Sequence, residues 1–99
     1  MPYYVGLFKF TDFGRQNIKS SPDRLAAARQ AAAKVGVKLD TVLYTMGEYD
    51  LVGIAEAPDD ETMAKMSATI MSLRGVTTTT MRAFTPEEFR KITADLPSS

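Results

Sequence analysis

The eight residues from position 3 to position 10 restrict the possible fold more than any other segment of the sequence. They are largely aromatic or β-branched, and apolar side chains occur in both phases of strand alternation. One phase contains Tyr3, Val5 and Leu7, and the other contains Tyr4, Phe8 and Phe10. A strand that is apolar on both faces needs packing on both sides. Residues 3–10 are therefore predicted to form a strand in the middle of a sheet.

The next part of the sequence predicts a loop followed by a helix. Residues 11–20 are mostly polar and contain a glycine, which favours a loop. The triplet Ser-Pro-Asp at residues 21–23 suits a helix start, because Ser can cap, Pro fits the first turn and Asp meets the positive helix end. Apolar residues then recur every three or four positions until Val35, and Gly36 can end the helix in a left-handed conformation.

The remaining segments continue the alternation of strands and helices. Residues 37–46 and 50–57 are predicted strands of a hairpin that turns at residues 46–49. A helix follows from residue 58 and ends at Gly75, with an apolar stripe that faces the sheet. The stripe consists of Met63, Met66, Ile70 and Leu73. Residues 76–83 contain four consecutive threonines and predict a fourth strand, and a capping box at residues 85–88 opens a short final helix through Ala94.

This order of elements, βαββαβ plus a terminal helix, is that of the ferredoxin-like fold. The spatial strand order of such a sheet is 4-1-3-2, which puts the first and third strands in the centre. Those are the two most continuously apolar strands of this sequence, as central strands should be. A chain of 99 residues holds about one domain with one core. We expect a single α+β domain over residues 1–99 with an antiparallel sheet.

Composition argues against several classes of function. Twelve Lys and Arg balance twelve Asp and Glu, so no net charge attracts the chain to nucleic acid or anionic lipid. The chain has no Cys and no His, which removes the key side chains of structural zinc sites, haem ligation and Ser-His-Asp catalysis. No segment is long and apolar enough to span a membrane. We expect a cytoplasmic protein with no metal or cofactor.

The pattern of the central strands also predicts self-association. Two helices cover only one face of the sheet, yet both faces of the central strands are apolar. A second copy packing face to face would cover the other side, giving a homodimer or a higher homo-oligomer. An outward residue such as Phe8, replaced by Asp, would then break the assembly. The alternative is a monomer whose final helix folds back over the second face.

The sequence resembles the GYD-domain family, named after a Gly-x-Tyr-Asp turn. Residues 44–52 contain this turn, and residues 56–60, Glu-Ala-Pro-Asp-Asp, extend the similarity. Residues 11–24 and the segment from Arg82 through the Thr-Pro-Glu-Glu motif also resemble the family, so the match extends over almost the whole chain. The family is similar in fold to the dimeric α/β-barrel proteins and is functionally uncharacterised as a family. Other members of that fold group include cofactor-free oxygenases, haem-degrading enzymes, isomerases and small-ligand sensors.

The hairpin turn is the main candidate for a ligand site. Tyr44, Glu48, Tyr49 and Asp50 place two phenols and two carboxylates near one another, and Arg82 on the fourth strand can bind an anion. Such groups can orient a polar ligand or share a proton when they open into a cavity. The alternative is purely structural: Gly47 supplies a positive φ and the Asp of the turn accepts unpaired backbone N–H groups.

Three further residues invite a chemical interpretation. Arg24 and Lys9 are additional candidate anion ligands, although their direction does not follow from the sequence. Pro2 would become an N-terminal secondary amine after removal of Met1, as in tautomerases that use such a group as a base. Pro2 more commonly only permits removal of Met1.

Three functions remain open from the sequence. The first is a homo-oligomeric protein that binds a small molecule between the sheet and the helices near Tyr44, Tyr49, Asp50 and Arg82. The second is a cofactor-independent enzyme, an oxygenase or an isomerase or tautomerase, acting on an aromatic or keto substrate. The third is a structural or accessory module in which these polar groups serve turns and salt bridges.

Overall fold

A four-stranded antiparallel sheet forms the centre of the structure, a computed structural model that describes residues 1–98. Its strands are β1 (Tyr3–Phe10), β2 (Lys38–Tyr44), β3 (Leu51–Glu56) and β4 (Val76–Ala83). The helices are α1 (Asp12–Gln16), α2 (Ser21–Lys34), α3 (Asp60–Ser72) and α4 (Pro86–Thr93), and a short 3-10 helix, η1 (Ile18–Ser20), precedes α2. The predicted α+β, ferredoxin-like class is therefore confirmed. No helix within residues 1–98 has the length and apolar character needed to cross a membrane.

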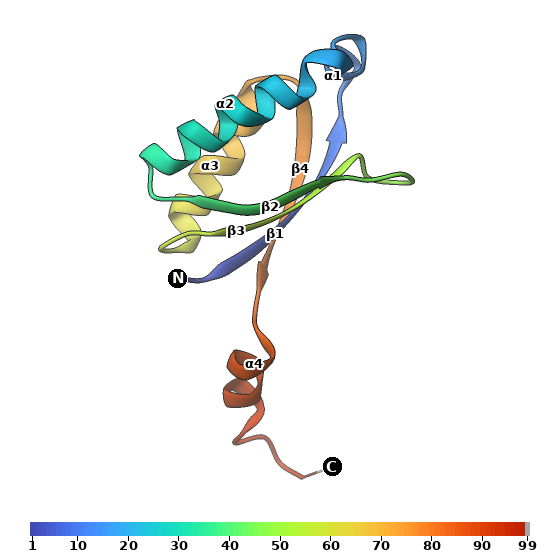
Figure 1. The fold of residues 1–99 in the computed structure, drawn as a ribbon. Helices are drawn as coiled ribbons and strands as arrows, with labels where there is room; N and C mark the ends of the chain where they lie inside the picture. The colour runs from blue at the N-terminus through green and yellow to red at the C-terminus, as the bar shows by residue number, and fades with distance from the viewer. Residues whose placement is uncertain (99) are drawn as a thin grey trace.

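The order of the strands in the sheet is β2-β3-β1-β4, so β1 and β3 are central and β2 and β4 are the edges. β1 pairs along its whole length with β4, from Tyr3 opposite Ala83 to Phe10 opposite Val76. Helices α2 and α3 lie together on one side of the sheet (Figure 1). The two long helices thus cover a single face.

The core lies between this face of the sheet and the two helices. Tyr4 is the largest core side chain that carries a polar group, and it is only 3% exposed. Small side chains such as Ala32 and Ala57 are fully buried, which lets α2 approach the sheet closely. Met63 and Met66 of α3 are buried as their spacing predicts, whereas Leu73 is exposed at the helix end. Methionines here fill the core.

The region between β1 and α2 is more ordered than the predicted loop. Thr11 caps α1, because its hydroxyl accepts a hydrogen bond from Gly14 N–H at 3.1 Å. Gly14 is buried against the chain after α3, and a Cβ on it would lie 2.0 Å from the carbonyl oxygen of Gly75. That oxygen accepts a hydrogen bond from Thr11 N–H. The prediction of a loop was wrong because this contact with a distant segment organises residues 11–20.

Both glycines that the sequence predicts in the left-handed conformation adopt it. Gly36 has φ of 83° after α2, and Gly47 has φ of 101° in the hairpin turn. After α3, however, Arg74 adopts the positive φ, 71°, instead of Gly75. The guanidinium of Arg74 lies 4.6 Å from the centre of the Phe13 ring, so α1 packs against this unusual residue. Gly75 serves close packing rather than a left-handed turn.

The second face of the sheet is apolar and uncovered within residues 1–98. Val5 and Leu7 of β1 lie on this face beside β3 and β4. Ile54 is 41% exposed, and Leu43 and Met81 are also exposed there. Phe8 is on the opposite face, among the residues that face the helices. The prediction that Phe8 points outward was therefore wrong.

Helix α4 does not fold back over the open face. Figure 1 shows α4 beyond the end of the sheet, joined to β4 by an extended connection. The Cα radius of gyration is 15.3 Å, whereas a compact chain of this length has a radius of about 12.6 Å. The alternative of a monomer that covers its second face with the final helix is thus contradicted by the structure.

Candidate functional site

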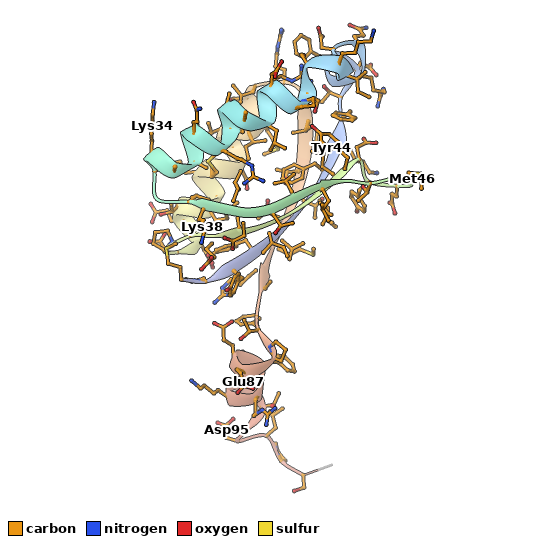
Figure 2. All side chains as sticks on the ribbon, in the orientation of Figure 1. Lys34, Lys38, Tyr44, Met46, Glu87 and Asp95 are labelled. Carbon is orange, nitrogen blue, oxygen red and sulfur yellow. The ribbon has the colours of Figure 1, made fainter. Side chains whose placement is uncertain are left out.

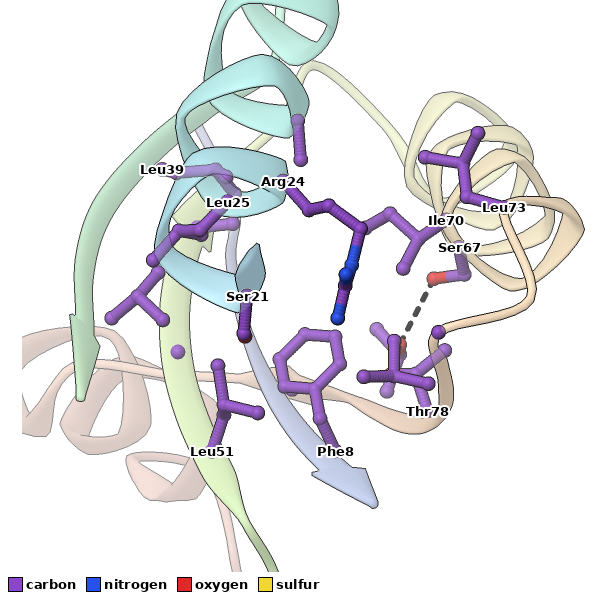
Figure 3. A pocket seen from close by; sticks show the side chains of 18 of the residues that line it. Phe8, Ser21, Arg24, Leu25, Leu39, Leu51, Ser67, Ile70, Leu73 and Thr78 are labelled. Atoms are coloured by element: carbon purple, nitrogen blue, oxygen red, sulfur yellow. Dashed lines mark hydrogen bonds between the residues drawn. The ribbon is translucent and has the colours of Figure 1, made fainter. Parts of the chain in front are cut away.

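A cavity of about 100 Å³ lies between the helix-facing side of the sheet and helices α2 and α3. Figure 3 shows its interior, with Phe8 and Leu51 on the sheet side and Leu25 and Ile70 on the helix side. Its walls are almost entirely apolar, and the polar lining side chains are few. They are Ser21, Arg24, Ser67, Thr78, Thr80 and the phenol-bearing Tyr4.

Two paired glycines form part of the cavity floor. Gly6 of β1 lies directly opposite Gly53 of β3 in the sheet register. The ring of Phe8 lies over the two glycines: a Cβ on Gly6 would lie 2.8 Å from Phe8 Cζ. A Cβ on Gly53 would lie 3.6 Å from the same ring, an ordinary contact. The missing side chains in the middle of two central strands thus leave room above the sheet, and the Phe8 ring takes up part of it.

Arg24 brings the single positive charge to the cavity. It projects from the first half of α2, and Figure 3 shows its guanidinium directed toward the space beside Phe8. Its Nη1 donates hydrogen bonds to the carbonyl oxygen of Asn17 at 3.1 Å and to the hydroxyl of Ser20. Within residues 1–98, Arg24 has no salt bridge, and its Nε and Nη2 groups donate no hydrogen bond. This edge, which lies beside Gly75, makes no hydrogen bond in the structure, and it is the one with which arginine binds a carboxylate through two parallel hydrogen bonds.

Hydroxyl groups on two sides of the cavity are already paired. Ser67 of α3 lies 2.9 Å from Thr80 of β4, which in turn lies 3.1 Å from Thr78. On the other side, the hydroxyl of Ser21 lies 2.9 Å from that of Tyr44. Each of these hydroxyls keeps spare acceptor capacity, since a hydroxyl oxygen has two lone pairs. Tyr44 therefore reaches the rim of the cavity through Ser21.

Tyr4 closes the far end of the cavity as a neutral group. Its hydroxyl donates a hydrogen bond of 2.6 Å to Asp60 Oδ1 in the first turn of α3. Burial, reinforced by this hydrogen bond to a carboxylate, raises the pKa of Tyr4 to about 12. The phenol thus remains protonated over the physiological range and acts as a hydrogen-bond donor.

Asp50 from the predicted site ties the hairpin to β1. Its side-chain Oδ2 accepts a hydrogen bond of 2.8 Å from Phe10 N–H, and its own N–H donates to the Phe8 carbonyl oxygen at 2.8 Å. The carbonyl oxygen of Asp50 also accepts a hydrogen bond from Thr45 N–H. Asp50 thereby extends the pairing of β1 and β3 beyond the last backbone pair of that ladder.

Glu48 and Tyr49 lie near each other on the outer side of the same turn. Lys9 Nζ is 3.9 Å from Glu48 Oε1 and 5.3 Å from the centre of the Tyr49 ring. The Glu48 side chain is largely exposed, so this ion pair is weak. Neither residue lines the cavity.

Arg82 is at the other end of the sheet. It lies opposite Tyr4 in the β1–β4 register, whereas Asp50 contacts Phe8 and Phe10. Tyr4 and Phe10 are six residues apart on one strand, or about 20 Å. The guanidinium of Arg82 stacks on the Phe84 ring at 4.3 Å and donates to backbone carbonyl oxygens. The structure thus brings Tyr44, Glu48, Tyr49 and Asp50 to one end of the sheet and does not bring Arg82 to them.

The glycine pair that lines the cavity was not predicted from the sequence. Gly6 and Gly53 each interrupt an otherwise apolar strand, and such a glycine often marks close approach of a ligand or another chain segment. Strand pairing of residue 6 with residue 53 would have exposed the signal. Arg24 was considered as an anion ligand, but its direction into the cavity becomes evident only in the structure.

Comparison with known proteins places the chain in a family. The family model described as the GYD domain matches residues 4–93. A protein of Thermus thermophilus named "Glutamine synthetase and cystathionine beta-lyase binding protein" is 30% identical over 84 residues, which cover 84% of this chain and 88% of that protein. No solved structure matches the chain. Since the family model covers nearly all of the sheet, α2 and α3, this chain belongs to the GYD-domain family.

Proposed function

We propose that this protein is a homo-oligomeric binding protein whose ligand is a small carboxylic acid held between the sheet and helices α2 and α3. The observation that carries this proposal is an apolar cavity with one arginine edge free for hydrogen bonding. Sites for small molecules commonly combine an apolar lining with a few polar groups that fix the orientation of the ligand. The cavity of this chain has that composition.

The chemistry of Arg24 favours a carboxylate over other polar groups. Its Nε and Nη2 groups form a planar fork that matches the two oxygens of a carboxylate. The surrounding walls are apolar, so the rest of the ligand should be a hydrocarbon chain or ring. In the Ser21–Tyr44 pair one hydroxyl donates to the other, so one proton of the pair is left to donate a hydrogen bond to the ligand.

The size of the cavity favours a small ligand. A closed apolar cavity of roughly 150 Å³ holds benzene. The cavity of about 100 Å³ in this chain is only partly enclosed, so part of a ligand can extend beyond it. A short-chain or single-ring acid fits these limits, and a large cofactor does not.

The uncovered sheet face supports self-association. Val5, Leu7 and Ile54 form an apolar surface that faces water in the single chain. A compact monomer of 10.9 kDa exposes about 5,600 Å² of surface, whereas this chain exposes 6791 Å². The excess of roughly 1,200 Å² exceeds the ~800 Å² that each partner buries in a standard interface.

Calorimetric titration and thermal-shift measurements with defined acids test whether the protein binds a small carboxylic acid. We expect hexanoate or benzoate to bind and to raise the melting temperature, and hexanol or benzamide to bind at least about tenfold more weakly, because they lack the carboxylate. Arg24→Gln should abolish the preference for the acid. Arg90→Gln, which changes an exposed arginine on α4, serves as the matched control and should bind like the wild type.

The proposal fails if neither acid binds and the protein also retains no small acid when purified from its own cells. It also fails if Arg24→Gln and Arg90→Gln bind the acids equally well. Loss of binding by both variants, with normal melting temperatures, would likewise contradict a specific role of Arg24.

A second candidate function is binding to metabolic enzymes, and the name of the Thermus thermophilus relative favours it. An exposed apolar face is the kind of surface that a protein partner covers. Sedimentation of the purified chain with purified glutamine synthetase and cystathionine β-lyase from the same source tests it directly. Co-sedimentation with either enzyme at micromolar concentration would support the function, and independent sedimentation with both would exclude it.

A further inference from the structure

The C-terminal arm, residues 84–96, presents an apolar surface to water. Phe89 is 55% exposed and Ile92 is 48% exposed, and they lie three residues apart on one face of α4. Phe84 and Leu96 extend the exposed apolar surface at the two ends of the arm. Figure 2 shows the side chains of the arm, between Glu87 and Asp95, standing clear of the sheet and of the other helices.

The sequence nevertheless contains strong local signals for the helix α4. Thr85 and Glu88 form a capping box, with hydrogen bonds of 3.1 Å and 2.8 Å to each other's backbone N–H groups. Pro86 occupies the first turn, and Arg90 and Lys91 stand in the last turn, where positive charge is favourable. An eight-residue helix is still marginal in water when it packs against nothing. A well-capped helix with an unused apolar face therefore needs a docking surface.

We infer that this arm docks through Phe89 and Ile92 on a second copy of the same chain. The inference rests on the proposed self-association and is independent of the ligand cavity. The chain exposes roughly 1,200 Å² more surface than a compact monomer of its mass, and the projecting arm contributes to this excess. Each partner of a standard interface buries ~800 Å², so docking of the arm can supply part of the area that a stable dimer needs. In such an assembly, the arm of each copy contacts the other copy.

Two observations favour a second copy over an unrelated partner. The arm continues directly from β4, which is an edge of the sheet whose open face is also apolar, so both surfaces border the same region. The polar side of α4 carries both signs, Glu87 and Glu88 with Arg90 and Lys91, and the whole chain has no net charge. Such a surface neither selects a strongly charged partner nor repels a copy of itself.

Photo-crosslinking of the full chain tests the inference. A benzophenone amino acid replaces Phe89 in one protein and Lys91, on the polar side of the helix, in a control protein. We expect irradiation to give a covalent dimer several times more efficiently from position 89 than from position 91. The crosslink from position 89 should join peptides of two copies when light and heavy isotope-labelled chains are mixed. Crosslinks within one chain, or only to a different protein in cell extract, would overturn the inference.

Sedimentation of point variants separates the arm from the sheet face. We expect the double change Phe89→Ser and Ile92→Ser to weaken self-association at least about tenfold, because it removes the apolar contact. The domain should stay folded, since neither side chain belongs to the core. The matched control, Glu87→Ser with Lys91→Ser, should keep the wild-type assembly. If the wild type is itself a monomer, the proposed self-association fails together with this inference. A wild-type oligomer that the Phe89 and Ile92 changes leave intact overturns the inference alone.

Discussion

Individual residues divide into those that make the cavity and those that hold its frame. Gly6, Gly53 and Arg24 belong to the first group, since two supply space and one supplies an unpaired charge. Tyr4 and Asp50 belong to the second group, because the side chain of each makes a hydrogen bond within the fold. This division predicts opposite effects of substitution on stability and on binding.

Gly53→Ala should stabilise the fold and weaken binding of the ligand. The new methyl group would make only ordinary contacts of 3.5 to 3.6 Å. Glycine inside a strand costs roughly 0.5–1 kcal/mol relative to alanine, so the melting temperature should rise by a few degrees. The methyl group would occupy the cavity floor and should weaken hexanoate binding several-fold. Unchanged binding with higher stability would place the ligand elsewhere.

Asp50→Ala should destabilise the fold without changing ligand binding. The substitution leaves Phe10 N–H without its acceptor, which costs about 1–3 kcal/mol for a partly buried group. Asp50→Asn is the control, because its amide oxygen can still accept this hydrogen bond and should cost less. Chemical denaturation measures both free energies of unfolding. Normal stability with lost hexanoate binding would instead support the sequence-based hypothesis that Asp50 contacts the ligand.

Tyr4 should titrate above the ordinary pKa of a tyrosine. Its pKa is raised from 10.0 to about 12 in the folded protein, chiefly by burial. The unfolded chain loses this proton at lower pH, so the stabilisation is fully present below pH 10 and is lost as pH rises through 12. Absorbance titration should show a tyrosine step near pH 12 that Tyr4→Phe removes. Survival of that step in the variant would contradict the assignment.

At the scale of elements, a contact between two glycines connects the start of α1 to the end of α3. Gly14 packs against Gly75, and the Thr11 hydroxyl also donates a hydrogen bond to the Arg74 carbonyl oxygen. These contacts hold the connection between β1 and α2 beside the start of β4. Arg24 donates to Asn17 and Ser20 in the same region, so its position depends on this packing.

Gly14→Ala should therefore strongly destabilise the domain. Its Cβ would meet a backbone oxygen at 2.0 Å, and backbone cannot move aside as a flexible side chain can. We expect a loss of at least about 2 kcal/mol in the free energy of unfolding. Gly47→Ala is the comparison, because its Cβ meets open space and only the left-handed conformation costs about 1–2 kcal/mol. Equal melting temperatures for Gly14→Ala and the wild type would contradict the close packing.

The elements that sequence could predict are those determined by local signals. The strand over residues 76–83 and the capping box at residues 85–88 match the structure, as do the left-handed glycines at positions 36 and 47. The helical turn after Thr11 was missed, because its stability depends on a contact with a segment more than sixty residues away. The local sequence does not predict a contact between such distant segments.

The candidate site was less predictable than the elements, for a physical reason. Both phases of β1 are apolar, so the pattern identifies a central strand but does not say which phase faces the helices. Phe8 was assigned to the wrong face for this reason. Arg82 and Asp50 are both polar residues near strand ends, and only strand direction in the assembled sheet separates them. The turn residues could be grouped from sequence because they are neighbours in the chain.

At the scale of the whole molecule, the single chain exposes more surface than a compact monomer of its mass, and part of that surface is apolar. The C-terminal arm projects beyond the sheet and elongates the molecule to 53 × 31 × 18 Å (Figure 1). One side of the sheet supplies the proposed ligand cavity and the other supplies the proposed interface. Assembly and binding would thus use opposite faces of the same two central strands.

Leu7→Lys should separate the copies while leaving the domain folded. Leu7 lies on the open face between Val52 of β3 and Thr79 of β4. A lysine there would be buried without a partner in the assembly, which should weaken self-association at least about 100-fold. Ala27→Lys, on an exposed position of α2, is the control and should keep the wild-type mass. Light scattering measures both, and an unchanged mass for Leu7→Lys would contradict a sheet-face interface.

Native mass spectrometry of gently purified protein from its own cells tests the central claim most directly, because it reports assembly and retained ligand together. For the wild type we predict a homo-oligomer whose chains carry an added small-molecule mass that analysis identifies as a carboxylic acid. Arg24→Gln should keep the same oligomer and lose the added mass. A wild-type monomer, or identical masses for the wild type and Arg24→Gln, would contradict the account.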